Sequence, residues 1–289
     1  MLAPAGDSAI VVSDLSKSYG RVLAVNRISF AVRRGTTTAL LGGNGAGKTT
    51  TLSMLLGLLT PSAGRATVLG SEMPGERHRV LPRMNFTSPY VDLPKRLTVG
   101  ENLAVFADLY GVRRARERIA AVAADCDLGG LLRRPYGSLS AGQRTRVSLA
   151  KAVLNEPEVL LLDEPTASLD PDIGDRMRTY LERYQHRTGC TMLLASHHMG
   201  EVERMCDDVI MLRAGEVVDQ GSPRALIERY GRETMEEVFL DVARGRADVM
   251  APSEAALGAA SPQGASALGR PGGAHSLRKC SITAATAAG

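Results

Sequence analysis

A glycine-rich segment at residues 42–50 constrains the fold of this chain more than any other feature. It reads Gly-Gly-Asn-Gly-Ala-Gly-Lys-Thr-Thr, follows a β-rich run at 36–41 and precedes a stretch with helical spacing at 48–58. Glycines let backbone N–H groups turn inward around an anion without Cβ clashes. The start of the following helix adds a partial positive charge. The segment therefore predicts a phosphate-binding loop between a strand and a helix.

This loop fits the pattern G-x-x-x-x-G-K-[ST], with Gly42 and Gly47 at its glycine positions. Lys48 would neutralise charge on the β- and γ-phosphates, and the Thr49 hydroxyl would ligate Mg²⁺. A plain glycine-rich connector is the alternative, and the flanking strand and helix argue against it. The loop predicts nucleotide binding but does not choose among kinases, GTPases and ATPases.

A pair of carboxylates, Asp163 and Glu164, ends a short continuous apolar run at 158–163. Such a run is typical of a strand buried on both faces of a parallel sheet, and ligands bind at the carboxyl ends of such strands. We expect Asp163 to hold Mg²⁺, directly or through water. Because side chains alternate along a strand, Glu164 should point another way, as suits a general base that polarises the attacking water. The alternative, a charged strand end facing solvent, is disfavoured by the phosphate loop upstream.

The order of elements predicts an α/β fold. Strands and helices alternate, which favours a mostly parallel sheet with crossovers. Helical patterns at 99–110, 113–124 and 141–154 indicate an inserted helical subdomain at about 90–155. Amphipathic pieces at 222–230 and 233–242 would close a domain that spans 8–242.

Residues 243–289 differ in composition, because Ala and Gly supply 21 of the 47 positions. This segment has too few large apolar residues to offset its ordering entropy, so we predict a disordered tail. It also carries five basic and two acidic residues, most of the net charge of +4. An excess of basic residues in this segment is weak evidence for nucleic-acid binding, and we expect no nucleic-acid partner.

Other composition features exclude several classes of protein. The chain lacks a run of about 18 apolar residues that could span a membrane, and its N-terminus lacks the pattern of a secretory leader. Its four cysteines are far apart, which fits neither a disulfide framework nor a zinc site. We therefore expect a reduced, cytoplasmic setting.

Three further pieces are weak signals when taken singly. Leu139-Ser-Ala-Gly-Gln opens a helix, with Ser140 as a good N-cap and Gly142 permitting close approach of another group. Ser168-Leu-Asp follows the carboxylate pair, and His197 follows an expected strand at 191–195. A lone histidine is usually structural or on the surface.

Taken in order, however, these motifs resemble those of one family. The glycine-rich loop, Leu139-Ser-Ala-Gly-Gln, Leu160-Leu-Leu-Asp-Glu-Pro-Thr-Ala-Ser-Leu-Asp and Ala195-Ser-His-His resemble the nucleotide-binding subunit of an ATP-binding cassette (ABC) transporter. The resemblance covers about residues 8–242. It implies a P-loop NTPase fold of the RecA-like type, with a mostly parallel sheet core, an N-terminal antiparallel β subdomain and an inserted helical subdomain.

The resemblance also implies roles for matching residues. Tyr19 would stack on adenine, Asp163 would bind the metal, and Glu164 would be catalytic. His197, rather than His198, would contact the γ-phosphate as a second catalytic residue, and Asp170 would communicate across a dimer. Nucleotide would further be bound by Gly42, Asn44, Gly45, Ala46, Gly47, Lys48, Thr49 and Thr50, and by Ser140, Gly142 and Gln143 from a second subunit.

The implied function is that of an ATP-hydrolysing motor with ATP and Mg²⁺, working as a head-to-tail dimer, most simply a homodimer. Its membrane partner would be a polytopic permease that holds it at the inner face of the cell membrane.

Segments 97–103 and 233–242 resemble ATPase subunits of drug, lipid and polysaccharide exporters. An importer subunit is the main alternative. A soluble ABC ATPase acting on ribosomes or DNA is disfavoured, because there is neither a second motif set nor sustained heptads. A P-loop kinase would leave the Ser140 motif and His197 unexplained.

Two departures from the family pattern stand out. Ala141 replaces the more common glycine, a small change that we expect to be tolerated. The family normally has a glutamine in the loop before the helical subdomain, yet segment 83–94 contains none. Asn85, Ser88 or Pro89 would occupy that position, and slower hydrolysis or altered coupling is the resulting hypothesis. Placing glutamine at 88 or 89 and measuring ATP turnover tests it.

Overall fold

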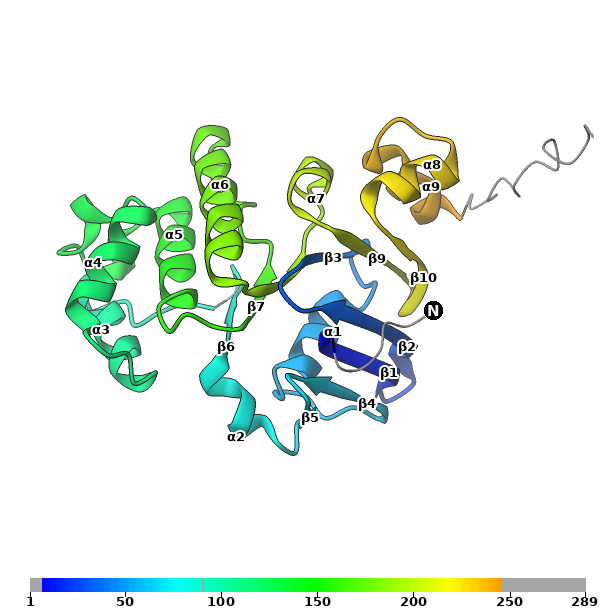
Figure 1. Ribbon diagram of the computed structural model, residues 1–289, viewed down its shortest axis with the longest axis horizontal. Coiled ribbons are helices and arrows are strands. Elements are labelled where there is room, and N and C mark those ends of the chain that lie inside the picture. The colour runs from blue at the N-terminus through cyan, green and yellow to red at the C-terminus, as the bar shows by residue number, and fades with distance from the viewer. Residues whose placement is uncertain (1–6, 90, 246–289) are drawn as a thin grey trace, which may run out of the picture. The chain divides into compact units, whose positions relative to one another are not determined.

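The computed structural model describes residues 7–89 and 91–245, which form two β-sheets flanked by helices (Figure 1). One sheet is antiparallel, with strand order β2-β1-β4-β5. Its strands are β1 (Ser8–Tyr19), β2 (Val22–Arg33), β4 (Ala63–Val68) and β5 (Ser71–Met73). The predicted N-terminal antiparallel subdomain is thus confirmed.

The second sheet is mostly parallel, in the order β10-β9-β3-β8-β7-β6. Its neighbouring strands are parallel except for β10, which runs antiparallel to β9. The strands are β3 (Thr37–Leu41), β6 (Met84–Thr87), β7 (Val159–Asp163), β8 (Thr191–Ala195), β9 (Asp208–Arg213) and β10 (Glu216–Gly221). The alternation of strands and helices therefore predicted the sheet type correctly.

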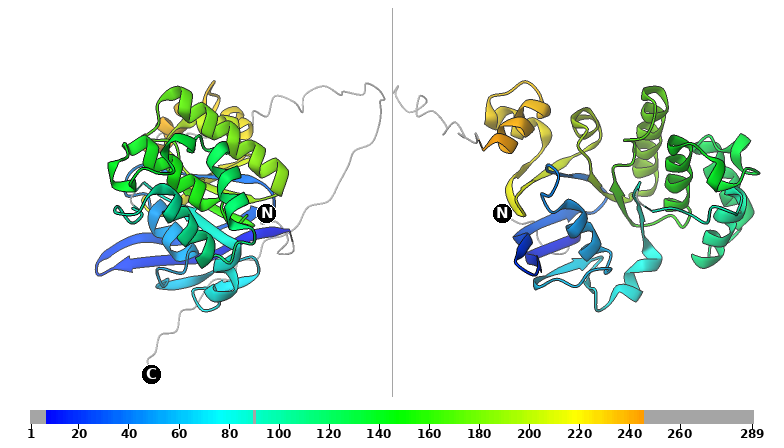
Figure 2. Two further views of the ribbon diagram at one scale, coloured as in Figure 1. Left: turned by 90° about the vertical axis from the view of Figure 1, so that its left-hand side faces the viewer. Right: turned by 180° about the vertical axis from the view of Figure 1, so that it is seen from behind.

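Three helices, α3 (Val99–Leu109), α4 (Ala115–Asp125) and α5 (Ala141–Ala152), follow one another between β6 and β7. They stand together beside the parallel sheet in two views, as expected for an inserted helical subdomain (Figures 1 and 2). The other helices are α1 (Lys48–Leu55), α2 (Arg77–Val80), α6 (Pro171–Thr188), α7 (Met199–Met205), α8 (Pro223–Tyr230) and α9 (Met235–Arg244). Short 3₁₀ turns occur at Leu81–Arg83, Gly129–Leu131 and Tyr136–Ser138. Helix α9 runs two residues past the expected domain end at 242, and most of the expected tail, 246–289, lies outside the described residues.

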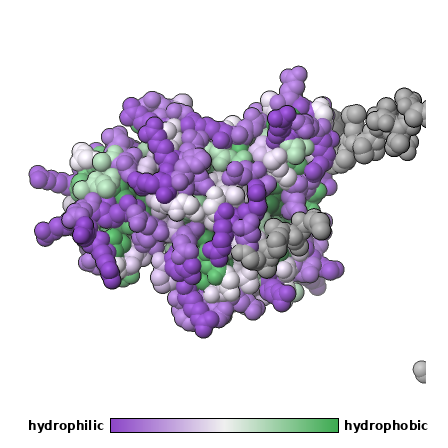
Figure 3. Space-filling model, in the orientation of Figure 1, coloured by the Kyte–Doolittle hydropathy of each residue, from purple (hydrophilic) through white to green (hydrophobic). Residues whose placement is uncertain are grey.

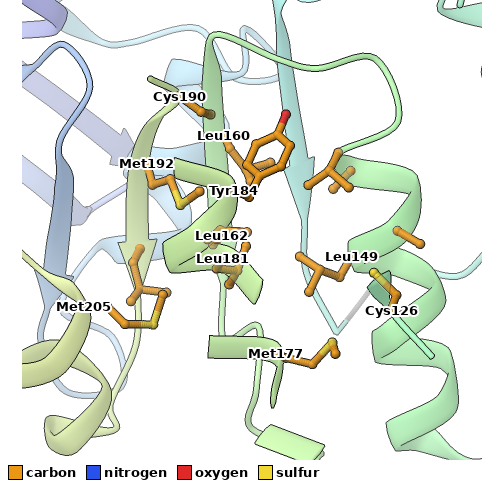
Figure 4. Close-up of a cluster of buried hydrophobic side chains, with 14 of the residues drawn as sticks. Cys126, Leu149, Leu160, Leu162, Met177, Leu181, Tyr184, Cys190, Met192 and Met205 are labelled. Carbon is orange, nitrogen blue, oxygen red and sulfur yellow. The ribbon is translucent and has the colours of Figure 1, made fainter. Parts of the chain in front are cut away.

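Strand β7 is buried on both faces, as its continuous apolar sequence predicts. Leu160 and Leu162 pack into one core cluster, whereas Leu161 faces the other. Figure 4 shows the first cluster, in which Leu160 and Leu162 lie among Leu181 of α6 and Met192 of β8. Burial of each leucine side chain contributes about 1.5–3 kcal/mol. The strand is therefore firmly held, and so is the carboxylate at its end.

Strands β5 and β6 and helix α2 were not predicted from the sequence. Strand β6 has only four residues, so its alternation of apolar side chains with the polar Asn85 and Thr87 is too short to mark a strand in the sequence. Those side chains are buried against the helical subdomain: Thr87 and Ser148 of α5 share a hydrogen bond of 2.8 Å, and Lys151 donates to Asn85 at 3.2 Å. Partners supplied by tertiary structure thus make a polar edge strand stable.

The described surface is largely hydrophilic on the face seen in Figure 3, with scattered apolar patches. Within residues 7–89 and 91–245, no helix combines the length and apolar character needed to cross a bilayer.

Candidate functional site

The glycine-rich loop lies between β3 and α1, as predicted. Gly45 and Gly47 have φ angles of 78° and 100°, the left-handed region that side chains disfavour. Gly42 is required for another reason: a Cβ there would lie 2.6 Å from the Leu212 carbonyl oxygen of β9 and 2.7 Å from the Ala46 Cβ. The loop is therefore pressed against the parallel sheet at Gly42, and Gly42, Gly45 and Gly47 cannot be exchanged freely.

Lys48, the first residue of α1, turns back over this loop. Its Nζ donates to the carbonyl oxygens of Gly42 at 2.5 Å and Gly43 at 3.2 Å. Burial lowers the pKa of Lys48, while the nearby carboxylates of Glu164 and Asp163 oppose that shift. The ammonium group thus lies over the loop, within electrostatic reach of the two carboxylates.

Asp163 is the last residue of β7 and is 4% exposed. Ser88 lies just beyond the neighbouring strand β6, and its hydroxyl donates to Asp163 Oδ2 at 3.2 Å. Burial raises the pKa of Asp163, and Glu164 raises it further, whereas the Ser88 bond and Lys48 lower it. Of the candidates for the missing glutamine, Ser88 therefore contacts the expected metal carboxylate. Asn85 instead faces α5.

Glu164 and His197 meet because β7 and β8 are parallel and end together. The strand register pairs Asp163 with Ala195, and the Glu164 backbone N–H donates to the Ala195 carbonyl at 2.8 Å. Glu164 is one residue past β7 and His197 two residues past β8, and the His197 Nδ1 lies 2.6 Å from Glu164 Oε1. The other oxygen, Glu164 Oε2, is buried without a hydrogen-bond partner among the described residues.

The orientation of the Glu164 side chain has a different cause from the one expected. It lies just past β7 with a φ of 50°, in the left-handed region, so a backbone turn orients its side chain. Strand alternation, the basis of the prediction, does not apply there. The expected separation of the Asp163 and Glu164 side chains stands, but its physical reason was wrong.

Ser140 and Gln143 form a capping box at the start of α5, as the sequence suggested for Ser140. The Ser140 hydroxyl accepts from the Gln143 N–H at 3.3 Å, and the Ser140 N–H donates to Gln143 Oε1 at 3.1 Å. A Cβ on Gly142 would lie 3.0 Å from the Ser168 carbonyl oxygen. Gly142 thus lets the segment after β7 approach this helix closely.

The remaining predicted residues differ in how far they are exposed. Tyr19 ends β1 and is 50% exposed, with Lys17 Nζ 5.4 Å from its ring centre. The adjoining strand β2 touches the loop, since a Cβ on Gly47 would lie 2.7 Å from the Ala24 carbonyl oxygen. Asn44 and Thr49 are exposed, Thr50 is half-buried, and Ala46 is buried.

The described structure therefore gathers Lys48, Asp163, Glu164 and His197 at one edge of the parallel sheet. It places Ser140, Gly142 and Gln143 at the start of α5, where Ser140 and Gln143 bond to each other. Sequence reasoning missed Thr166, Ser196 and Glu201. The hydroxyls of Thr166 and Ser196 both donate to the Glu201 carboxylate. A hydroxyl residue two positions after Glu164 and another just before His197 were the available signals.

Comparison with known proteins decides the family. The sequence model of the ABC transporter family matches residues 25–167. Nod factor export ATP-binding protein I of Ralstonia nicotianae is 38% identical over 247 residues, covering 83% of this chain and 75% of that protein. The chain belongs to the ABC transporter ATP-binding family. It is an ATP-binding subunit and an ATPase, as the order of its motifs predicted.

Solved structures of ABC proteins share this fold. An ATP-binding subunit of an ABC transporter superimposes with a TM-score of 0.76 at 26% identity, covering 81% of this chain and 99% of that one. An ATP-binding cassette solved as a dimer in a post-hydrolysis state with ADP and phosphate gives a TM-score of 0.68 at 23% identity, covering 74% and 98%. The predicted P-loop NTPase fold is confirmed for this ABC subunit.

Proposed function

We propose that this ABC subunit hydrolyses Mg²⁺-bound ATP at the interface of a head-to-tail dimer and thereby drives an exporter. One observation carries the hydrolytic part: Glu164 and His197 are in contact at 2.6 Å beside Lys48 and Asp163. A general base must have its proton-accepting atom within reach of the attacking water. Glu164 fits, because His197 holds one of its oxygens and the other has no partner among the described residues.

Lys48 and the loop would bind the β- and γ-phosphates through the ammonium group and inward N–H groups. His197 would orient Glu164 and reach the γ-phosphate, since its side chain is 59% exposed. Tyr19 would offer its exposed ring to adenine. The expected phosphate site would be completed by Gly42, Asn44, Gly45, Ala46, Gly47, Thr49 and Thr50.

The donor set near the loop fits Mg²⁺. Asp163 supplies a buried carboxylate and Thr49 an exposed hydroxyl. The described residues contain no cluster of three His, Cys, Asp or Glu side chains that could enclose a metal. Mg²⁺ typically takes one or two protein ligands and fills its shell with water and phosphate oxygens, so Asp163 and Thr49 would suffice. When bound, it would neutralise phosphate charge.

The start of α5 supports a dimer. Ser140, Gly142 and Gln143 surround the positive end of a helix of 12 residues, a suitable site for an anion. In the proposed dimer they would contact the γ-phosphate bound by the partner subunit, so that each ATP lies between two chains. A homodimer would then hold two composite sites.

The direction of transport is proposed from relatives. The relative from Ralstonia nicotianae, which covers 83% of this chain, is named as an export ATP-binding protein. Segments 97–103 and 233–242 also resemble exporter subunits. We infer a cytoplasmic subunit held at the inner face of the membrane by a polytopic permease. An importer subunit is the remaining alternative. Co-purification of the full chain from membranes with a polytopic protein tests the partner, and recovery with ribosomes or DNA instead would overturn it.

Glu164→Gln tests the site and the dimer together. The variant should bind ATP, lose about a hundredfold or more of its hydrolysis rate and accumulate as an ATP-bound dimer in analytical ultracentrifugation. Glu158→Gln is the matched control, because Glu158 directly precedes the same strand and pairs with Arg83 at the surface. Full turnover by Glu164→Gln would refute the assigned base, and an ATP-bound monomer would refute the dimer.

A further inference from the structure

A buried carboxylate behind the site plays no part in the function proposed so far. Glu201 lies in the first turn of α7 and is 3% exposed. Its Oε1 accepts from the Thr166 hydroxyl at 2.9 Å, and its Oε2 accepts from the Ser196 hydroxyl at 2.6 Å. Both carboxylate oxygens are therefore engaged by side chains from other segments.

The two hydroxyl donors belong to the segments that carry Glu164 and His197. Thr166 lies two residues after Glu164, and Ser196 directly precedes His197. Because His197 and Glu164 are themselves in contact, the bonds close a ring that runs through both segments and returns through Glu201. The Ser196 hydroxyl also accepts from the His198 N–H at 3.1 Å, which fixes the turn on which His197 sits.

The ring extends to the start of α5. Leu169 N–H donates to the Thr166 carbonyl at 3.1 Å, which folds residues 166–169 into a turn. Another carbonyl of that turn, Ser168 O, would lie 3.0 Å from a Cβ on Gly142. Glu201 thus links the segment packed on the start of α5 to the segment that carries His197.

A role in packing alone does not explain a glutamate at this position. Burial of a carboxylate is costly unless hydrogen bonds compensate it, and an apolar side chain of similar length would fill the same space. What the carboxylate adds is two acceptors that hold two separate segments at fixed positions.

We propose that Glu201 is a positioning residue for ATP hydrolysis, which holds Glu164 and His197 in contact by tying together the segments after β7 and β8. This inference rests on the proposed roles of Glu164 and His197. Glu201 does not touch the reacting atoms. Its loss lets the two segments separate, while the phosphate loop that binds ATP is left in place.

Replacement of Glu201 by methionine removes both acceptors at similar volume. The Glu201→Met subunit should lose about tenfold or more in kcat, because small misplacements of catalytic groups are costly. Its Kd for ATP should stay within about twofold, since the phosphate loop and Lys48 are left unchanged. Glu201→Gln should recover part of kcat, because its amide can accept from one hydroxyl and donate to the other.

Asp241→Asn is the matched control. Asp241 is 8% exposed and pairs with Arg232 at 2.6 Å, and neither residue belongs to the proposed site. That variant should lower the melting temperature yet keep kcat, when both are measured on the folded protein. Equal kcat in Glu201→Met and wild type would overturn the proposal, as would a rise in the Kd for ATP that accounts for the lost rate.

A double-mutant cycle tests the link without changing Glu201, in case that variant folds poorly. Thr166→Val and Ser196→Ala each cut the same connection, so their joint effect on kcat should be clearly smaller than the product of the single effects. Independent, multiplying effects would contradict the proposal. Glu164→Gln separates the two hypotheses: if it remains inactive while Glu201→Met is active, only the role of Glu201 fails. If Glu164→Gln turns over ATP, the proposed function itself fails.

Discussion

Gly42→Ala is the sharpest steric test of the phosphate loop. The added Cβ would lie 2.6 Å from the Leu212 carbonyl oxygen and 2.7 Å from the Ala46 Cβ, whereas ordinary contacts begin near 3.4 Å. The loop must therefore move by about 0.8 Å, the difference between 3.4 and 2.6 Å. Leu212 belongs to β9, which is paired on both sides, so the loop rather than the strand must give way.

Overpacking of this kind costs about 1–3 kcal/mol, which corresponds to a loss of about 2–12 °C in melting temperature for a domain of this size. The shift also moves inward-facing N–H groups off the phosphates, so nucleotide affinity should fall. Thermal melts followed by circular dichroism and titration with a fluorescent ATP analogue measure both effects.

Gly43→Ala is the matched comparison for stability. A Cβ on Gly43 meets nothing within 4 Å, and its φ is not in the left-handed region. That variant should melt within about 2 °C of wild type, as surface substitutions without a steric conflict do. If Gly42→Ala melts and binds nucleotide like wild type, or if Gly43→Ala loses as much stability, the steric reasoning is refuted.

Three further outcomes follow from the site and the core. Lys48→Ala should weaken ATP binding about tenfold or more, because a charge-assisted phosphate contact is lost; unchanged affinity in a binding titration would contradict the loop assignment. Ser88→Ala removes the bond to Asp163 and should lower the rate of phosphate release about two- to tenfold. Ser88→Gln and Pro89→Gln test the missing glutamine, and unchanged ATP turnover in both variants would remove that hypothesis. Burial raises the pKa of the Cys190 thiol from 9.0 to about 12. The folded state then keeps a proton that the unfolded state loses, so the stability this thiol contributes is complete below pH 9 and falls by up to about 1.4 kcal/mol per pH unit above it. The advantage of wild type over Cys190→Val in urea unfolding should shrink from pH 9 to 10.5, and a constant difference would be the wrong result.

Much of this architecture could be predicted because the decisive signals are local. Continuous apolar runs such as 158–163 mark buried parallel strands, and their carboxyl ends lie at one edge of the sheet by geometry alone. Asp163 and Glu164 could therefore be expected near Lys48 from the sequence, whereas only the family resemblance placed His197 beside them. The family resemblance assigned roles to these residues, and the structure supplied the distances between them.

The features that escaped prediction depend on contacts between distant segments. Strand β6 carries Asn85 and Thr87, which are stable in a sheet only because α5 offers them partners. Glu201 sits in a short helix, where a charged side chain is normally expected to face water. Its burial becomes favourable only when Thr166 and Ser196, from two other segments, converge on it. Burial of Glu201 leaves no periodic trace in the sequence, and the alternation in β6 spans only four residues.

In the proposed dimer, the serine at the start of α5 would perform two tasks with one oxygen atom. Its lone pair accepts the Gln143 N–H and completes the helix, while its hydroxyl proton stays available for donation outward. An aspartate would cap the helix equally well, but it has no proton to offer and its charge would repel a phosphate of the partner subunit. In the proposed dimer, the residue needed at position 140 is thus decided by proton donation, and helix stability alone would have accepted several others.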